Sequence, residues 1–209
     1  MASLAWSLGL LLLIATPLGC QDSKKIDYPN KEQLRASIEA FKNRKIYRTL
    51  DVATLQKIPD DELEQAIIDY VETKVNGNYK EEPKMVRSLP EGIRAIYVTW
   101  WVESEVINGG FNQFFWNSHG VFAEDAVKGY EFLGAPEYAA LMRQAIAVNL
   151  AEEPHMKKFR DQNSRESFSE SYQHTKLTDI DNKFDKLGSG LRHTRIKVIR
   201  EKPELFTGN

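Results

Sequence analysis

Two acidic residues offer the clearest prospect of acid–base chemistry in this sequence. Glu103 and Glu105 follow Trp100 and Trp101 in an apolar run, and burial in such surroundings raises a carboxyl pKa toward values that suit proton transfer. Residues two apart on a helix point in different directions, so the pair cannot face one substrate together. We therefore expect a structural role, in which one carboxylate is solvated and the other is bonded to an amide or an arginine. The alternative is an enzyme site that uses Glu103 or Glu105 with His119.

The remaining reactive residue types form no recognisable catalytic or metal-binding pattern. The histidines lack the His-x-x-x-His and His-Glu-x-x-His spacings of metal sites. The single cysteine, Cys20, does not supplement them as a metal ligand. Ser118-His119 is not a Gly-x-Ser-x-Gly motif, and no Lys-Ser or Lys-Thr follows Gly109-Gly110 as in a phosphate-binding loop. We predict no metal, no cofactor and no enzymatic activity.

Amide side chains gather around a pair of glycines and form the second candidate site. The residues concerned are Asn108, Gly109, Gly110, Phe111, Asn112, Gln113 and Asn117. A polar group that is buried without a partner costs on the order of 1–3 kcal/mol. We expect these amides to bond to backbone groups that are freed at a helix break. The alternative is that they recognise the polar groups of a ligand or partner.

A long helix must position both candidate sites. Apolar residues recur at helical spacing from about Pro90 to Ile107, and Ser88 with Glu91 has the form of a capping box. The Asn108-Gly109-Gly110 segment should end this helix, because glycine disfavours a helix interior. Residues 111–117 then suit a short second helix that packs back onto the first.

Helical spacing also dominates the rest of the chain. Further helices are predicted over residues 30–45, with Asn30 and Gln33 as caps, and over 59–75, 124–133 and 136–152. Pro154 should end the last of these, and residues 157–175 should form a loop or broken helices. Apolar residues return at helical spacing from Leu177 to Leu191, and clean period-two patterns are absent. The fold class is therefore all-α, with one compact multi-helix domain over 31–209.

The predicted helix over 59–75 has an acidic face. Its members are Asp60, Asp61, Glu62, Glu64, Asp69 and Glu72. Acids in the first turn complement the helix dipole. We expect a solvated face; the alternative is a surface that binds a partner.

The N-terminus predicts export. The first nineteen residues carry no charged side chain, Leu8 to Ile14 is nearly all leucine, and Cys20 is the only cysteine in the 209-residue chain. This arrangement resembles the lipobox of bacterial lipoproteins. We expect a lipoprotein-type signal peptide over 1–19, lipid attachment at Cys20, a polar tether over 20–30 and a membrane-anchored protein. The alternative is a soluble periplasmic or secreted protein.

The segment Val106-Ile-Asn-Gly-Gly-Phe-Asn-Gln-Phe-Phe-Trp-Asn-Ser-His-Gly120, called the signature below, resembles the signature of the DNA-mimic protein family. Residues 126–135, 177–184 and 199–206 are similar to other segments of that family, so the resemblance covers about 60–206. It implies an all-helical fold, often dimeric, with no established enzymatic activity. It also implies an acidic surface that imitates DNA phosphates and occupies a DNA-binding protein.

Three functions remain open. The first is a non-enzymatic, envelope-tethered helical protein that binds a protein or envelope component and can form a homodimer. A formal net charge of −2 argues against direct nucleic-acid binding. The second is a DNA mimic that uses the acidic face from Asp60 to Glu72, in a chain that is not exported. The third is the enzyme site near Glu103, Glu105 and His119.

Overall fold

The computed structural model describes residues 30–188 and 190–208, with the side chains of Ser118 and His119 left aside. The described elements are helices, which confirms the all-α prediction. The chain divides into unit 1, Met1–Ile46, and unit 2, Tyr47–Asn209. The predicted signal peptide, Cys20 and the tether up to residue 29 lie outside the described residues. Within the described part, no helix combines the length and hydropathy needed to cross a bilayer.

Unit 1 contains helix α1, Lys31–Lys42, which begins at the predicted capping box. The Asn30 side chain accepts a hydrogen bond from the Gln33 backbone N–H at 2.9 Å, and the Gln33 side chain accepts one from the Asn30 N–H at 2.8 Å. Both donors would otherwise be free at the helix start. None of the twelve residues of α1 is buried.

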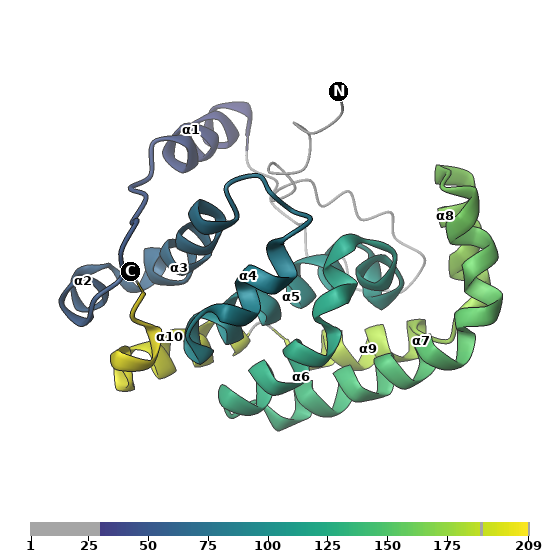
Figure 1. The fold of residues 1–209 in the computed structure, drawn as a ribbon. Coiled ribbons are helices and arrows are strands. Elements are labelled where there is room, and N and C mark those ends of the chain that lie inside the picture. The colour runs from purple at the N-terminus through teal and green to yellow at the C-terminus, as the bar shows by residue number, and fades with distance from the viewer. Residues whose placement is uncertain (1–29, 189, 209) are drawn as a thin grey trace. The chain divides into compact units, whose positions relative to one another are not determined.

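Unit 2 is built around α5, Glu91–Trp116, which contacts α3, α6, α7 and α9 (Figure 1). The apolar stripe predicted for this helix lies in the core over most of its length, since Ile93, Ile96 and Tyr97 are 0% exposed. Ile107 at its end is 60% exposed, so the prediction is wrong for that residue. The other helices are α2 (Val52–Lys57), α3 (Asp60–Val75), α4 (Glu82–Ser88), α6 (Ala123–Phe132), α7 (Pro136–Gln162), α8 (Arg165–Ser171), α9 (Thr178–Leu187) and α10 (Gly190–Glu201). Short 3-10 helices span Ser118–Phe122, Tyr172–His174 and Pro203–Phe206.

Helix α7 contradicts the prediction that Pro154 ends a helix. The helix continues through Pro154 to Gln162, and α8 follows it, so residues 157–175 form broken helices, the second of the two predicted alternatives (Figure 1). Proline removes one backbone donor, which weakens a helix but does not forbid one whose later turns are anchored. Met156 and Phe159 supply that anchorage, since they are 3% and 2% exposed.

Helix ends elsewhere follow the sequence in part. Asn76 ends α3 with left-handed backbone at φ 46°, as its type predicts. The capping box predicted at Ser88 is wrong. Ser88 is the last residue of α4, its hydroxyl donates to the Met85 carbonyl at 2.6 Å, and α5 begins after Pro90 without a side-chain cap.

An antiparallel backbone pair joins the beginning and end of unit 2. The Leu50 N–H donates to the Gly208 carbonyl at 2.8 Å, and the Gly208 N–H donates back to Leu50 at 2.7 Å. Leu50 is 1% exposed, so the pair lies against the core. The last residues of the described chain are thereby held beside the first residues of this unit.

Candidate functional site

The signature contains a break in α5 at the predicted glycines. Gly109 (φ −161°, ψ 26°) and Gly110 (φ 72°, ψ 178°) leave the helical conformation, and helix resumes at Phe111. The Gly110 backbone lies in a region that is essentially restricted to glycine. A Cβ atom there would also lie 2.4 Å from the Asp181 carboxylate. Glycine is therefore required at position 110 both by conformation and by space.

Two side chains from distant parts of the chain satisfy the backbone at the break. The Phe111 N–H donates to Asp181 Oδ1 of α9 at 2.7 Å. The Tyr172 hydroxyl donates to the Gly109 carbonyl, also at 2.7 Å. Asp181 thus acts as a helix cap from seventy residues away. Sequence reasoning missed both residues, because nothing in their local pattern points to α5.

Burial shifts the pKa of both groups. It raises the pKa of Asp181 above the ordinary value, although the bond from the Phe111 N–H acts to lower it. Burial raises the pKa of Tyr172 to about 12, and the nearby charge of Asp181 adds to this rise. Tyr172 therefore keeps the proton that it donates to Gly109 throughout the physiological range.

Asn112, Gln113 and Asn117 bond to side chains, not to the freed backbone groups as predicted. Gln113 Nε2 and Asn117 Nδ2 both donate to Glu105 Oε2, at 2.6 and 2.8 Å. Asn112 Nδ2 donates to Ser171 Oγ at 2.8 Å. Because Glu105 precedes the break and its two amide partners follow it, this carboxylate links the two halves of α5. Hydrogen bonds to a charged acceptor are stronger than neutral ones.

Glu103 belongs to a separate buried network. Arg195 of α10 is 0% exposed and donates from Nη1 to Glu103 at 2.6 Å and to Glu64 at 2.7 Å. Its Nε donates to Thr99 Oγ1 at 3.1 Å. Burial alone would lower the pKa of Arg195, but the charges of Glu103 and Glu64 raise it above its ordinary value. The network ties α3, α5 and α10 together.

The two acids of the enzyme hypothesis thus have different partners. Glu105 bonds to amides and Glu103 to an arginine, so the prediction that one of them is solvated is wrong. The structure does not bring the two carboxylates to one site. His119, the third member of that hypothesis, has its side chain outside the described atoms.

The acidic face predicted on α3 is divided. Glu64 and Asp69 are 7% and 4% exposed, so the expectation of one solvated face is wrong for them. Glu64 pairs with Arg195, Asp69 accepts from Gln65 at 2.9 Å, and Glu72 accepts from the Tyr97 hydroxyl at 2.7 Å. Helix α10 supplies the partner of Glu64 and α5 that of Glu72, which periodicity in α3 alone cannot reveal, whereas the partner of Asp69 lies within α3 itself.

Only the first turn of α3 keeps predicted acids on the surface. Asp60, Asp61 and Glu62 are exposed. Asp60 forms an ion pair with Arg200 of α10 at 2.6 Å, which neutralises part of this charge. The exposed acidic surface that remains from the predicted face is therefore short.

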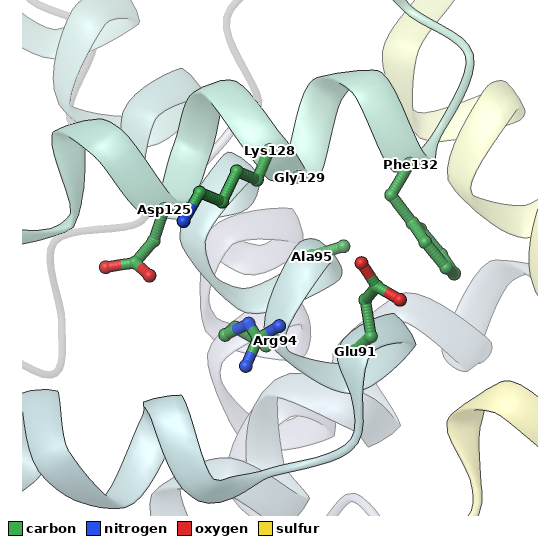
Figure 2. Close-up of a pocket in the computed structure, with 7 residues that line it drawn as sticks. All are labelled: Glu91, Arg94, Ala95, Asp125, Lys128, Gly129 and Phe132. Atoms are coloured by element: carbon green, nitrogen blue, oxygen red, sulfur yellow. The ribbon is translucent and has the colours of Figure 1, made fainter.

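A shallow hollow lies between the start of α5 and α6 (Figure 2). Its lining residues are Glu91, Arg94, Ala95, Asp125, Lys128, Gly129 and Phe132. Its volume of about 10 Å³ is roughly that needed by a single water molecule. The lining mixes both signs of charge and includes no residue of the signature, so this hollow is not the predicted site. Within the described residues, no group of three or more His, Cys, Asp or Glu side chains is arranged to hold a metal ion.

The signature presents a small part of itself to solvent. Ile107 is 60% exposed, and Asn108 beside it is exposed as well. Phe111, Phe114 and Asn112 are almost fully buried. Of the amides proposed for partner binding, Asn108 is thus the exposed one, whereas buried Asn112 and half-buried Gln113 and Asn117 bond to other side chains of the fold.

A comparison with known protein families matches the part of the chain that contains the signature. The model of the DMP19-like protein family matches residues 87–202, which is more than half of the chain. The match contains the signature, Tyr172, Asp181 and Arg195, whereas the acidic turn of α3 lies before it. No curated protein and no solved structure matches the chain. The chain belongs to the DMP19-like protein family, the DNA-mimic family that its signature resembles.

Proposed function

We propose that this protein is a non-enzymatic binding protein, tethered at the cell envelope, whose unit 2 recognises a protein or envelope component. The observation that carries the proposal is the division of the signature. Its half-buried amides Gln113 and Asn117 donate to Glu105 across the helix break, while Ile107 and Asn108 face solvent immediately before it. A segment used in this way presents a surface instead of reacting groups.

The break makes Ile107 and Asn108 a rigid surface. Tyr172 holds the carbonyl of the next residue, Gly109, and Asp181 holds the N–H of Phe111. Binding costs less conformational entropy when the contacting residues are already ordered. An exposed isoleucine on such a frame is a suitable apolar anchor for a partner, with Asn108 as an adjacent hydrogen-bonding group.

Affinity capture from the cell's own envelope fraction tests this surface. An Ile107→Asp/Asn108→Ala variant should lose the partner that the unaltered protein retains. Leu150→Asp is the matched control, because Leu150 is 66% exposed and lies on α7. Equal capture by all three proteins would remove the signature from the recognition surface.

The envelope tether is tested separately at Cys20. A Cys20→Ser variant should remain unprocessed and should no longer partition with lipid-modified proteins in detergent extraction. Unchanged processing and fractionation would show that no lipid is attached at this residue. This outcome would leave the proposed recognition surface standing, since it concerns only where the protein is held.

Family membership favours a second candidate, the DNA mimic. In this case the exposed acids Asp60, Asp61 and Glu62 imitate phosphates, whose charge dominates binding to proteins that recognise DNA. The protein should then compete with double-stranded DNA for a basic DNA-binding protein, and Asp61→Asn/Glu62→Gln should weaken the competition. A cytoplasmic location would favour this candidate, whereas absence of competition at low salt would exclude it.

A further inference from the structure

Helix α1 of unit 1 has an apolar face of a kind that favours an interface. Leu34, Ile38 and Phe41 recur at i, i+4 and i+7, which places them on one side of the helix. They are half-buried, and no residue of the helix is buried. A helix of twelve residues without buried positions is marginal in water. Burial of the apolar face against another apolar surface would therefore stabilise the helix.

Basic residues lie along one side of this face and directly after the helix. From residue 30 to 46 there are five Lys or Arg residues and two Glu, a local excess of three positive charges in a chain whose formal net charge is −2. The basic residues are Lys31, Arg35, Lys42, Arg44 and Lys45. The Arg44 guanidinium lies 3.6 Å from the centre of the Phe41 ring and donates to the Phe41 carbonyl. Positive charge is thus placed at the edge of the apolar face.

We propose that α1 lies on the surface of an anionic lipid bilayer, with Leu34, Ile38 and Phe41 in the acyl boundary and its basic side chains among the headgroups. Apolar residues on one face and Lys or Arg on the other are the features of interfacial helices. Negative headgroups attract basic segments with roughly a fivefold gain in affinity per Lys or Arg. The ligand class is an anionic phospholipid surface.

The position of α1 along the chain supplies a route to that surface. Ten residues separate Cys20 from Lys31, and that length spans at most roughly 35 Å when fully extended. The delivery of α1 to a membrane rests on the proposed function, because it is lipid at Cys20 that would bring the helix there. The affinity of α1 for lipid does not depend on that step.

Amide hydrogen exchange of the full chain tests the proposal. The amides of residues 31–42 should exchange rapidly with vesicles of phosphatidylcholine alone and slowly with vesicles that also contain phosphatidylglycerol. An attached lipid would anchor the protein to both kinds of vesicle, so the comparison isolates the contribution of α1. High salt should reverse the protection, because headgroup attraction is screened.

Two variants and a control sharpen the result. Lys31→Gln/Arg35→Gln/Lys42→Gln should weaken α1 association roughly a hundredfold, and Ile38→Ser/Phe41→Ser should abolish protection. Lys84→Gln/Lys176→Gln/Lys186→Gln removes the same charge from exposed positions of unit 2 and should leave protection unchanged.

Three results would overturn the proposal. They are equal protection on both vesicles, undiminished protection in the α1 charge variant, and equal protection by double-stranded DNA without lipid. The last would identify a general polyanion-binding helix. Because unit 2 is unaltered in both α1 variants, partner capture through Ile107 and Asn108 would continue in each of these cases, which separates this inference from the proposed function.

Discussion

Asp181 provides the sharpest test of how the helix break is held. Its carboxylate is the acceptor for the Phe111 N–H, which lies in a fully buried residue. Asp181→Ala leaves this donor without its partner, and a buried unsatisfied group costs about 1–3 kcal/mol. Asp181→Asn keeps an acceptor oxygen at the same place and removes the cost of burying a charge. We expect the alanine variant to lose stability and the asparagine variant to stay close to the unaltered protein.

The dependence of stability on pH follows from the same residue. Burial raises the pKa of Asp181 above its ordinary 3.8, so the folded protein retains a proton that the unfolded chain has released. In the window between 3.8 and the raised value the folded state binds more protons, and the contribution of Asp181 to the free energy of unfolding therefore falls as pH rises. Asp181→Asn removes this slope.

Urea denaturation at neutral and acidic pH measures both effects. A loss of 1 kcal/mol lowers the melting temperature of a domain of this size by roughly 2–4 °C, so thermal melting gives an independent check. Asp185→Ala is the matched control, because Asp185 is exposed on the same helix. Equal losses in the alanine and asparagine variants, or no loss in either, would show that the bond to Phe111 does not hold the break.

Three further predictions concern neighbouring contacts. Gly110→Ala should lower the free energy of unfolding by at least about 3 kcal/mol in urea denaturation, through backbone strain and collision with Asp181. Gly77→Ala, where nothing lies within 4 Å of the added Cβ, should lower it by about 1 kcal/mol. Similar losses in the two variants would contradict the collision. Arg195→Met removes the buried partner of Glu103 and leaves Glu64 with only the longer contact to Arg192, at 3.6 Å. The variant should lose about 3–5 kcal/mol, and a stable variant by calorimetry would show that the buried ion pairs contribute little. Tyr172→Phe should lower the free energy of unfolding by about 1 kcal/mol. In the unaltered protein, the stability that the Tyr172 hydrogen bond contributes should disappear only as pH rises from 10 toward about 12. Ultraviolet titration of the tyrosine with parallel melting would follow this loss.

The helix break was predictable because its cause is local. Two adjacent glycines among helix-forming residues indicate a break from sequence alone, and Asn30 with Gln33 indicates a helix start in the same way. The groups that satisfy the break were not predictable. Asp181 and Tyr172 are brought to it by tertiary packing, and their own neighbours in sequence carry no trace of that contact.

The acidic face of α3 shows where helical periodicity gives a wrong prediction of exposure. Helical periodicity places Glu64 and Asp69 on the polar side of the helix, and an isolated helix would expose them. In the folded unit, Arg195 supplies a buried positive partner for Glu64. This ion pair offsets the cost of burying the Glu64 carboxylate, which the sequence pattern places in solvent. Pro154 was misjudged for a related reason, because Met156 and Phe159 anchor the turns that follow it.

The backbone pair between Leu50 and Gly208 holds the beginning and the end of unit 2 next to each other. A short linker could join its ends, and new ends could be opened at Gly134, an exposed turn with left-handed backbone and nothing within 4 Å of an added Cβ. Such a circularly permuted protein would keep every helix beside its present neighbours. It would also move the point at which unit 1 is joined to unit 2 from Tyr47 to the turn at Gly134, without altering a single residue of the core.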